Sequence, residues 1–166
     1  MTNETVQVAI IMGSDSDLPV VEASFSILDD FGVKYTKNVM SAHRTPHDVM
    51  GLIKNSEENG CKVFIAAAGM AAHLAGAVAA HSTKPVIGIP IESGGMGGID
   101  SLLSTAMMPP GVPVATVAVG KSGAKNSAIL AVQILATSDE NLAQKLVEYK
   151  QNMRSEVLEK DKKLNS

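Results

Sequence analysis

Gln7-Val-Ala-Ile-Ile-Met12 runs directly into Gly13-Ser-Asp-Ser-Asp17, and Pro19 follows two residues later. The first segment is a short, continuous apolar run, which is typical of a strand buried on both faces of a parallel sheet. Glycine ends this run, and proline favours the first turn of a helix. The stretch therefore predicts a buried strand that passes through a polar loop directly into a helix.

The same strand–loop–helix pattern repeats along the chain. Further strands are expected at residues 33–40, 62–67, 85–90 and 112–119, and helices at residues 19–31, 46–60, 74–80, from Asp100 onward, and 122–136. Strands that alternate with helices predict a parallel sheet with right-handed crossovers. The expected fold class is α/β, a three-layer α/β/α domain with a five-stranded parallel sheet of flavodoxin-like or Rossmann-like winding.

One more helix is expected at residues 138–163, after a core of about residues 6–136. Ser138 can cap this helix, with acidic residues in the first turn. An apolar stripe on one face is formed by Leu142, Leu146, Tyr149, Met153 and Val157. Because no strand remains for the helix to cover, we expect it to pack on a neighbouring subunit.

Composition narrows the class of protein. The 166 residues fit a single domain, 1–166, and a hydrophobic content of 45% is too high for a disordered chain. The net charge of −3 argues against a nucleic-acid surface. Cys61, the single cysteine, excludes a disulfide framework and fits a reducing compartment. With no signal peptide and no long apolar run, we expect a cytoplasmic protein without a membrane partner.

Charged residues are unevenly distributed. Only 6 of them lie between residues 61 and 138, whereas 12 lie between residues 137 and 166. A chain of this size has too much surface to leave so long a segment uncharged and exposed. We therefore expect a homo-oligomer that buries much of the middle segment; a large monomeric core is the alternative.

The loop at residues 13–17 has the residues of an anion site. Gly13 allows close backbone approach, and the hydroxyls of Ser14 and Ser16 suit a phosphate at a helix start. Asp17 could accept hydrogen bonds from ribose hydroxyls. The alternative is a plain helix cap, which serine and aspartate form routinely.

The loop Ser41-Ala-His-Arg-Thr-Pro46 follows the second expected strand. Arg44 can hold a phosphate with two parallel hydrogen bonds, and His43 beside it can give and take a proton near neutral pH. The alternatives are a structural histidine at a helix start and an arginine in a surface ion pair. Both residues lie between a strand end and a proline that starts a helix. This position favours binding and proton transfer over the structural alternatives.

His73 follows the third expected strand, beside small residues such as Gly69 that would admit a planar ligand. A histidine bonded to a nearby backbone carbonyl is the alternative. A metal site needs three or four convergent ligands, so His43 and His73 would have to be joined by one or two acidic side chains, and we expect no metal.

Six motifs in order resemble one family, the N5-carboxyaminoimidazole ribonucleotide mutases of bacterial purine biosynthesis, over residues 6–136. They are Gly13-Ser-Asp-Ser-Asp17, Ser41-Ala-His-Arg-Thr-Pro46, Ala71-Ala-His-Leu74, Pro85-Val-Ile-Gly-Ile-Pro90, Asp100-Ser-Leu-Leu-Ser104 and Gly111-Val-Pro-Val-Ala-Thr116. In this family an arginine after Ser-Ala-His marks the mutases, and a lysine marks enzymes that carboxylate aminoimidazole ribonucleotide directly. Arg44 stands at that position here, so the sequence resembles the mutase branch of the family.

The resemblance implies an isomerisation of a ribonucleotide substrate without metal, nucleotide cofactor or biotin, in a homo-octamer. The substrate carboxylate leaves the exocyclic nitrogen as carbon dioxide and returns to the ring carbon, and His43 is the proton shuttle. The implied substrate contacts are Ser14, Ser16 and Arg44 with the phosphate, Asp17 with the ribose, and Ser41, Gly69 and His73 beside the base. Met70, Ala75 and Met107 depart from the usual family pattern, which has Gly, Pro and Gln there.

Three other functions stay open at this point. The first is direct carboxylation of aminoimidazole ribonucleotide. The second is a catalytically silent module that binds a nucleoside monophosphate and does not need His43. The third, a flavodoxin-like electron carrier, is disfavoured because an aromatic content of 3% leaves little to stack on a flavin.

Overall fold

The computed structural model describes residues 5–165. Its five strands are β1 (Val8–Met12), β2 (Tyr35–Val39), β3 (Val63–Gly69), β4 (Val86–Ile91) and β5 (Ala115–Thr116). They form one parallel sheet in the order β2-β1-β3-β4-β5. This order is the flavodoxin-like winding, so the predicted fold class is confirmed.

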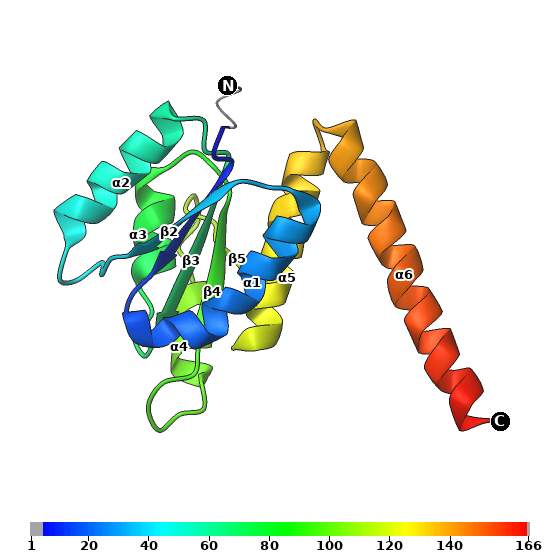
Figure 1. The fold of residues 1–166 in the computed structure, drawn as a ribbon. Helices are drawn as coiled ribbons and strands as arrows, with labels where there is room; N and C mark the ends of the chain where they lie inside the picture. Colours follow the sequence, from blue (N-terminus) through cyan, green and yellow to red (C-terminus); the bar gives the residue numbers. More distant parts are fainter. Residues whose placement is uncertain (1–4, 166) are drawn as a thin grey trace.

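Helices cover both faces of the sheet (Figure 1). The helices α1 (Leu18–Phe31) and α5 (Lys121–Ala136) pack on one face. The helices α2 (Pro46–Glu58) and α3 (Leu74–His81) pack on the other, where α4 (Ile99–Ala106) lies beside α3. Helices on both faces bury the central strands completely, which explains their continuous apolar runs.

Alternating side chains of the central strands supply the two halves of the core. In β1, Val8 and Ile10 face α1 and α5, whereas Ala9 and Ile11 face α2 and α3. All four are fully buried. This period of two is what a strand imposes on its side chains, and it fixes the register of the sheet.

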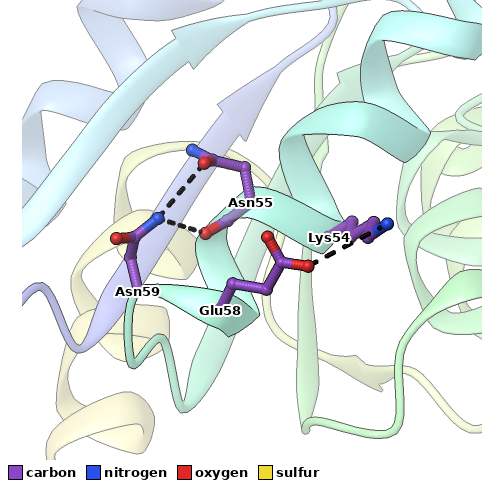
Figure 2. Close-up of polar contacts among 4 residues, drawn as sticks. All are labelled: Lys54, Asn55, Glu58 and Asn59. Atoms are coloured by element: carbon purple, nitrogen blue, oxygen red, sulfur yellow. Dashed lines mark hydrogen bonds and ion pairs between the residues drawn. The ribbon is translucent and has the colours of Figure 1, made fainter.

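Side-chain polar contacts form at the exposed C-terminal end of α2 (Figure 2). The Asn59 side chain donates hydrogen bonds to the backbone oxygen of Asn55 at 2.7 Å and to its side-chain oxygen at 3.1 Å. These bonds satisfy acceptors at the last turn. Lys54 and Glu58, four residues apart, form an ion pair at 4.0 Å; both are so exposed that the pair contributes little to stability.

The fifth strand is much shorter than the prediction of residues 112–119. Among the described residues, Ala115 and Thr116 pair with β4, opposite Ile87 and Gly88, and the N–H of Val117 donates to the Gly88 carbonyl at 3.1 Å. Pro113 lies just before them and has no N–H to donate to a ladder. The extended apolar pattern was therefore correct for the path of the chain, but wrong for the length of the strand.

The last helix, α6 (Glu140–Leu164), begins one residue later than a Ser138 cap would give. The Asp139 carboxylate caps it by accepting the N–H groups of Asn141 at 3.0 Å and Leu142 at 3.1 Å. The Ser138 hydroxyl instead donates to the Leu135 carbonyl of α5. Aspartate has the longer reach and the charge that the helix start favours, so it takes the capping position.

Among the described residues, the first part of α6 packs on the core, and the rest of the helix extends away from it (Figure 1). Leu142, Leu146 and Tyr149 pack on the core, and the Lys145 ammonium donates to the Phe31 carbonyl at 2.9 Å. Further along the same stripe, Met153 is 50% exposed and Val157 is 64% exposed. The predicted stripe is thus covered at one end and bare at the other. Within residues 5–165, no helix has both the length and the apolar character needed to cross a bilayer.

Candidate functional site

A cavity of about 510 Å³ opens where the loops after β1, β2, β3 and β4 meet. These loops all lie at the carboxyl edge of the sheet, where open α/β sheets bind their ligands. All eight predicted site residues line this cavity: Ser14, Ser16, Asp17, Ser41, His43, Arg44, Gly69 and His73. The structure therefore brings together every residue that the sequence singled out.

The loop after β1 is folded into a short 3₁₀ helix, Asp15–Asp17, that the sequence did not predict. The Ser14 hydroxyl accepts the backbone N–H of Ser16 at 3.3 Å and the Ser16 hydroxyl at 2.9 Å. The Asp17 carboxylate accepts the Ser14 N–H at 3.2 Å. These reciprocal bonds are a capping box, so the helix-cap interpretation of the loop is correct for Ser14 and Asp17. The cap and the cavity lining are the same residues.

Asp17 is the most buried polar side chain of the cavity, with an exposed fraction of 5%. Burial raises the pKa of Asp17 above its ordinary value of 3.8, because a carboxylate loses hydration there. The hydrogen bond from the Ser14 N–H opposes this shift, and the nearby charge of Asp15 adds to it.

The loop after β2 is a turn held by one hydroxyl. Ser41 Oγ accepts the backbone N–H groups of His43 at 3.3 Å and Arg44 at 3.2 Å. Thr45 Oγ1 closes the turn by accepting the Ser41 N–H at 3.0 Å. As a result, His43 and Arg44 leave the turn from backbone positions that are fixed relative to each other.

Arg44 connects this turn to the loop after β1. Its Nη2 donates to the Gly13 carbonyl at 3.1 Å. The residue is exposed and lines the cavity. A guanidinium held beside two serine hydroxyls has the donors that an anion needs.

His43 and His73 meet across the cavity. His43 Nε2 lies 2.8 Å from His73 Nδ1, and the two rings are nearly perpendicular at 84°. At this distance one nitrogen donates a hydrogen and the other accepts it, so the tautomers of the two rings depend on each other. His73 Nδ1 is therefore bonded to a second imidazole and not to a backbone carbonyl.

Gly69 allows the loops after β3 and β4 to touch. A Cβ at Gly69 would overlap the Ser93 hydroxyl and lie 3.2 Å from the Ile91 carbonyl oxygen. Ser93 also lines the cavity, and the sequence analysis missed it. Its only signal was its place in the glycine-rich segment 92–98 that follows β4.

Met70 follows Gly69 and also lines the cavity. Its φ is 55°, and it is the only non-glycine residue with a positive φ in the described chain, residues 5–165. Its side chain is 62% exposed. Across the same residues, no group of three or more His, Cys, Asp or Glu side chains is placed to hold a metal ion.

Fold and site together define a flavodoxin-like α/β protein with a polar ligand cavity at the carboxyl edge of its sheet. The sequence profile of the AIR carboxylase family matches residues 7–156, and the chain belongs to that family.

The chain is similar over nearly its whole length to proteins named N5-carboxyaminoimidazole ribonucleotide mutase. The Methanocaldococcus jannaschii protein is 50% identical over 157 residues, which cover 95% of this chain and 96% of that protein. The Thermotoga maritima protein is 51% identical, with 95% and 91% covered, and the Escherichia coli K12 protein is 46% identical, with 95% and 93% covered. The crystal structure of Treponema denticola PurE superposes with a TM-score of 0.88 at 31% identity, covering 96% of this chain and 99% of that one.

Proposed function

We propose that the protein converts N5-carboxyaminoimidazole ribonucleotide into 4-carboxy-5-aminoimidazole ribonucleotide. The observation that carries this proposal is an identity of about half to proteins named for this mutase activity, over 95% of the chain. The geometry supports it, because the same turn carries Arg44, which can bind a phosphate, and His43, which can transfer a proton. The activity requires both groups within one ribonucleotide length.

The substrate phosphate is bound by the Arg44 guanidinium and by the hydroxyls of Ser14 and Ser16. These donors already lie on adjoining loops, joined by the hydrogen bond from Arg44 to Gly13. Asp17 accepts hydrogen bonds from the ribose hydroxyls. The base lies beyond them, bordered by Ser41, Gly69 and His73.

His43 is the proton shuttle of the proposed reaction. The imidazolium donates a proton to the exocyclic nitrogen as its bond to the carboxylate carbon breaks, and the bonding electron pair stays on nitrogen. This step leaves aminoimidazole ribonucleotide, carbon dioxide and a neutral imidazole. The ring carbon then attacks carbon dioxide, and His43 takes the proton from that carbon. Protons and electrons balance over the cycle, so the reaction needs no outside reagent.

We also propose that the protein is a cytoplasmic homo-octamer in which residues 6–136 form the catalytic core. The support for assembly is the apolar surface left uncovered: Ile99 and Leu103 of α4 are 57% and 53% exposed, and Met153 and Val157 of α6 are bare. Such surfaces are typical of contacts between subunits. The support for the compartment is Cys61, a free, buried thiol.

The test is conversion of N5-carboxyaminoimidazole ribonucleotide, followed by ultraviolet absorbance, without ATP or metal and in bicarbonate-depleted buffer. Turnover that disappears in His43→Asn would support both the reaction and the shuttle. Activity only from aminoimidazole ribonucleotide with carbon dioxide would replace the proposal by direct carboxylation. No turnover in either assay, with the nucleotide still bound, would leave a silent binding module.

A further inference from the structure

A second cavity, of about 310 Å³, adjoins the first. Four residues line both cavities, and they are Gly13, Ser14, Ser41 and Arg44. Two of the proposed phosphate ligands, Ser14 and Arg44, therefore lie at the boundary between the cavities. His43 and His73 line the first cavity and not the second, so the proposed chemistry lies on one side of this boundary.

Asp15 lies on the other side of the boundary. It lines the second cavity and not the first. Its Oδ1 accepts a hydrogen bond from the Ser14 hydroxyl at 3.2 Å, and the Ser14 hydroxyl oxygen accepts one from the Ser16 hydroxyl at 2.9 Å. The Asp15 carboxylate is thus only one hydrogen bond away from a hydroxyl that is proposed to bind the substrate phosphate.

The second cavity has few groups that could bind an anion. Of the described residues in its lining, Arg44 is the only cation and Asp15 the only anion. The Thr45 hydroxyl in the same lining donates to the Ser41 carbonyl at 3.1 Å, and Val39 is apolar. In the proposed binding mode the substrate phosphate already uses Arg44. A second phosphate would therefore meet a carboxylate and no second cation.

The position of a second phosphate follows from the two linings. In the proposed binding mode the base lies beside His43 in the first cavity, and the phosphate lies at the boundary against Arg44. A nucleoside diphosphate that keeps its base in this position must place its second phosphate in the second cavity, beside Asp15. Like charges a few ångströms apart at a protein surface repel each other.

We propose that Asp15 makes the site selective for a single phosphate group by repelling a second one. The inference rests on the proposed function, because it takes the position of the base and of the first phosphate from it. Asp15 takes no part in the proton transfer. It acts on the choice of ligand, in the way that a like charge commonly excludes a wrong partner from a binding site.

The experiment compares two ligands by calorimetric titration. They are the 5′-monophosphate and the 5′-diphosphate of 4-carboxy-5-aminoimidazole ribonucleoside. Asp15→Asn keeps an oxygen that can accept the Ser14 hydroxyl, and it should raise the affinity for the diphosphate relative to the monophosphate roughly fivefold, the upper end of what one exposed charge contributes. Asp15→Lys should raise this ratio further, and Asp15→Glu should leave it as in the original chain. The gain in Asp15→Asn should shrink at high salt, because salt screens exposed charges.

A matched control removes the same charge elsewhere. Asp30 is exposed at the far end of α1 and lines neither cavity, so Asp30→Asn should leave the ratio of the two affinities unchanged. An unchanged ratio in Asp15→Asn, or an equal rise in Asp30→Asn, would overturn the role of Asp15. An equal loss of affinity for both ligands in Asp15→Asn would also overturn it, because Asp15 would then only orient Ser14. Failure of the original chain to bind the monophosphate would overturn the proposed function, and this inference with it.

Discussion

The backbone N–H of His43 donates to the Ser41 hydroxyl, and its imidazole contacts the imidazole of His73. Replacing it with asparagine keeps a polar group of similar size but removes the proton that the proposed reaction needs. We expect His43→Asn to abolish turnover while nucleotide affinity, measured by calorimetric titration with the product, stays within about tenfold, roughly 1.4 kcal/mol. Residual turnover close to that of the original chain would contradict the shuttle.

The proposed role of Arg44 is to bind the substrate phosphate, so its removal should have a different effect. Arg44→Ala should weaken nucleotide binding by about 1.5–3 kcal/mol, as expected for a lost charge-assisted hydrogen bond. Arg44→Lys keeps the charge but not the planar pair of donors, and it should recover only part of this loss. The same titration measures both variants, and equal affinity in Arg44→Ala would remove the phosphate contact from the proposal.

Asp17 makes stability depend on pH. Its folded-state pKa is raised above 3.8 by burial, so between 3.8 and the raised pKa the folded chain binds more protons than the unfolded chain. Stability therefore falls as pH rises through that window, and the charged carboxylate is a cost at neutral pH. Asp17→Asn should flatten this dependence and raise stability at neutral pH, measured by urea unfolding at several pH values. A variant with an unchanged pH profile would show that Asp17 pays no such cost.

The sequence was informative about these polar residues for a simple reason. Histidine and arginine between a strand end and a helix-starting proline have few structural uses, so His43 and Arg44 could be chosen from local context. Ser93 could not, because its place in the cavity depends on the loop after β4 touching Gly69, a contact between segments more than twenty residues apart. The pairing of His43 with His73 is a tertiary contact of the same kind.

Among the elements, the glycines of two helices offer a controlled comparison. Gly51 in α2 has no atom within 4 Å of the position a Cβ would take, whereas a Cβ at Gly123 in α5 would overlap the Ala118 carbonyl oxygen. Helix propensity alone favours alanine at both by up to about 1 kcal/mol. Gly51→Ala should therefore stabilise the chain by about that amount.

At Gly123 the packing term has the opposite sign and is larger. Forcing a methyl group into a backbone carbonyl shifts α5 against the loop after β5 and costs typically about 1–3 kcal/mol. Gly123→Ala should lower the free energy of unfolding in urea, with Gly51→Ala as its matched control. Stabilisation of both variants would mean that α5 can move freely on the sheet.

Element boundaries were predictable to the extent that one residue type determines them. Proline at the start of α2 and Gly32, with a φ of 73° at the end of α1, placed those helix ends well. The cap of α6 was placed one residue early because Ser138 and Asp139 are both good caps. The strand β5 was too long in the prediction because its apolar pattern continues past the few residues that can pair with β4.

At the scale of the whole molecule, the uncovered part of α6 should bind another subunit. Met153→Glu with Val157→Glu adds charge to the bare stripe and disturbs none of the contacts that Leu142, Leu146 and Tyr149 make with the core. We expect sedimentation to show a smaller assembly, because each buried apolar side chain contributes about 1.5–3 kcal/mol. Gln151→Glu, off the stripe, is the control. An unchanged mass in the double variant would place the contact elsewhere.

The turn that Ser41 holds has a consequence for ligand choice. Its hydroxyl fixes the backbone of His43, the proposed proton shuttle, relative to that of Arg44, the proposed phosphate ligand. In the proposed binding mode, this turn sets the distance between the bound phosphate and the base. A nucleoside lacks the phosphate that Arg44 binds in this mode, and the longer diphosphate places the base beyond the His43 imidazole. In that binding mode, the turn held by Ser41 favours a nucleoside monophosphate over a nucleoside or a diphosphate.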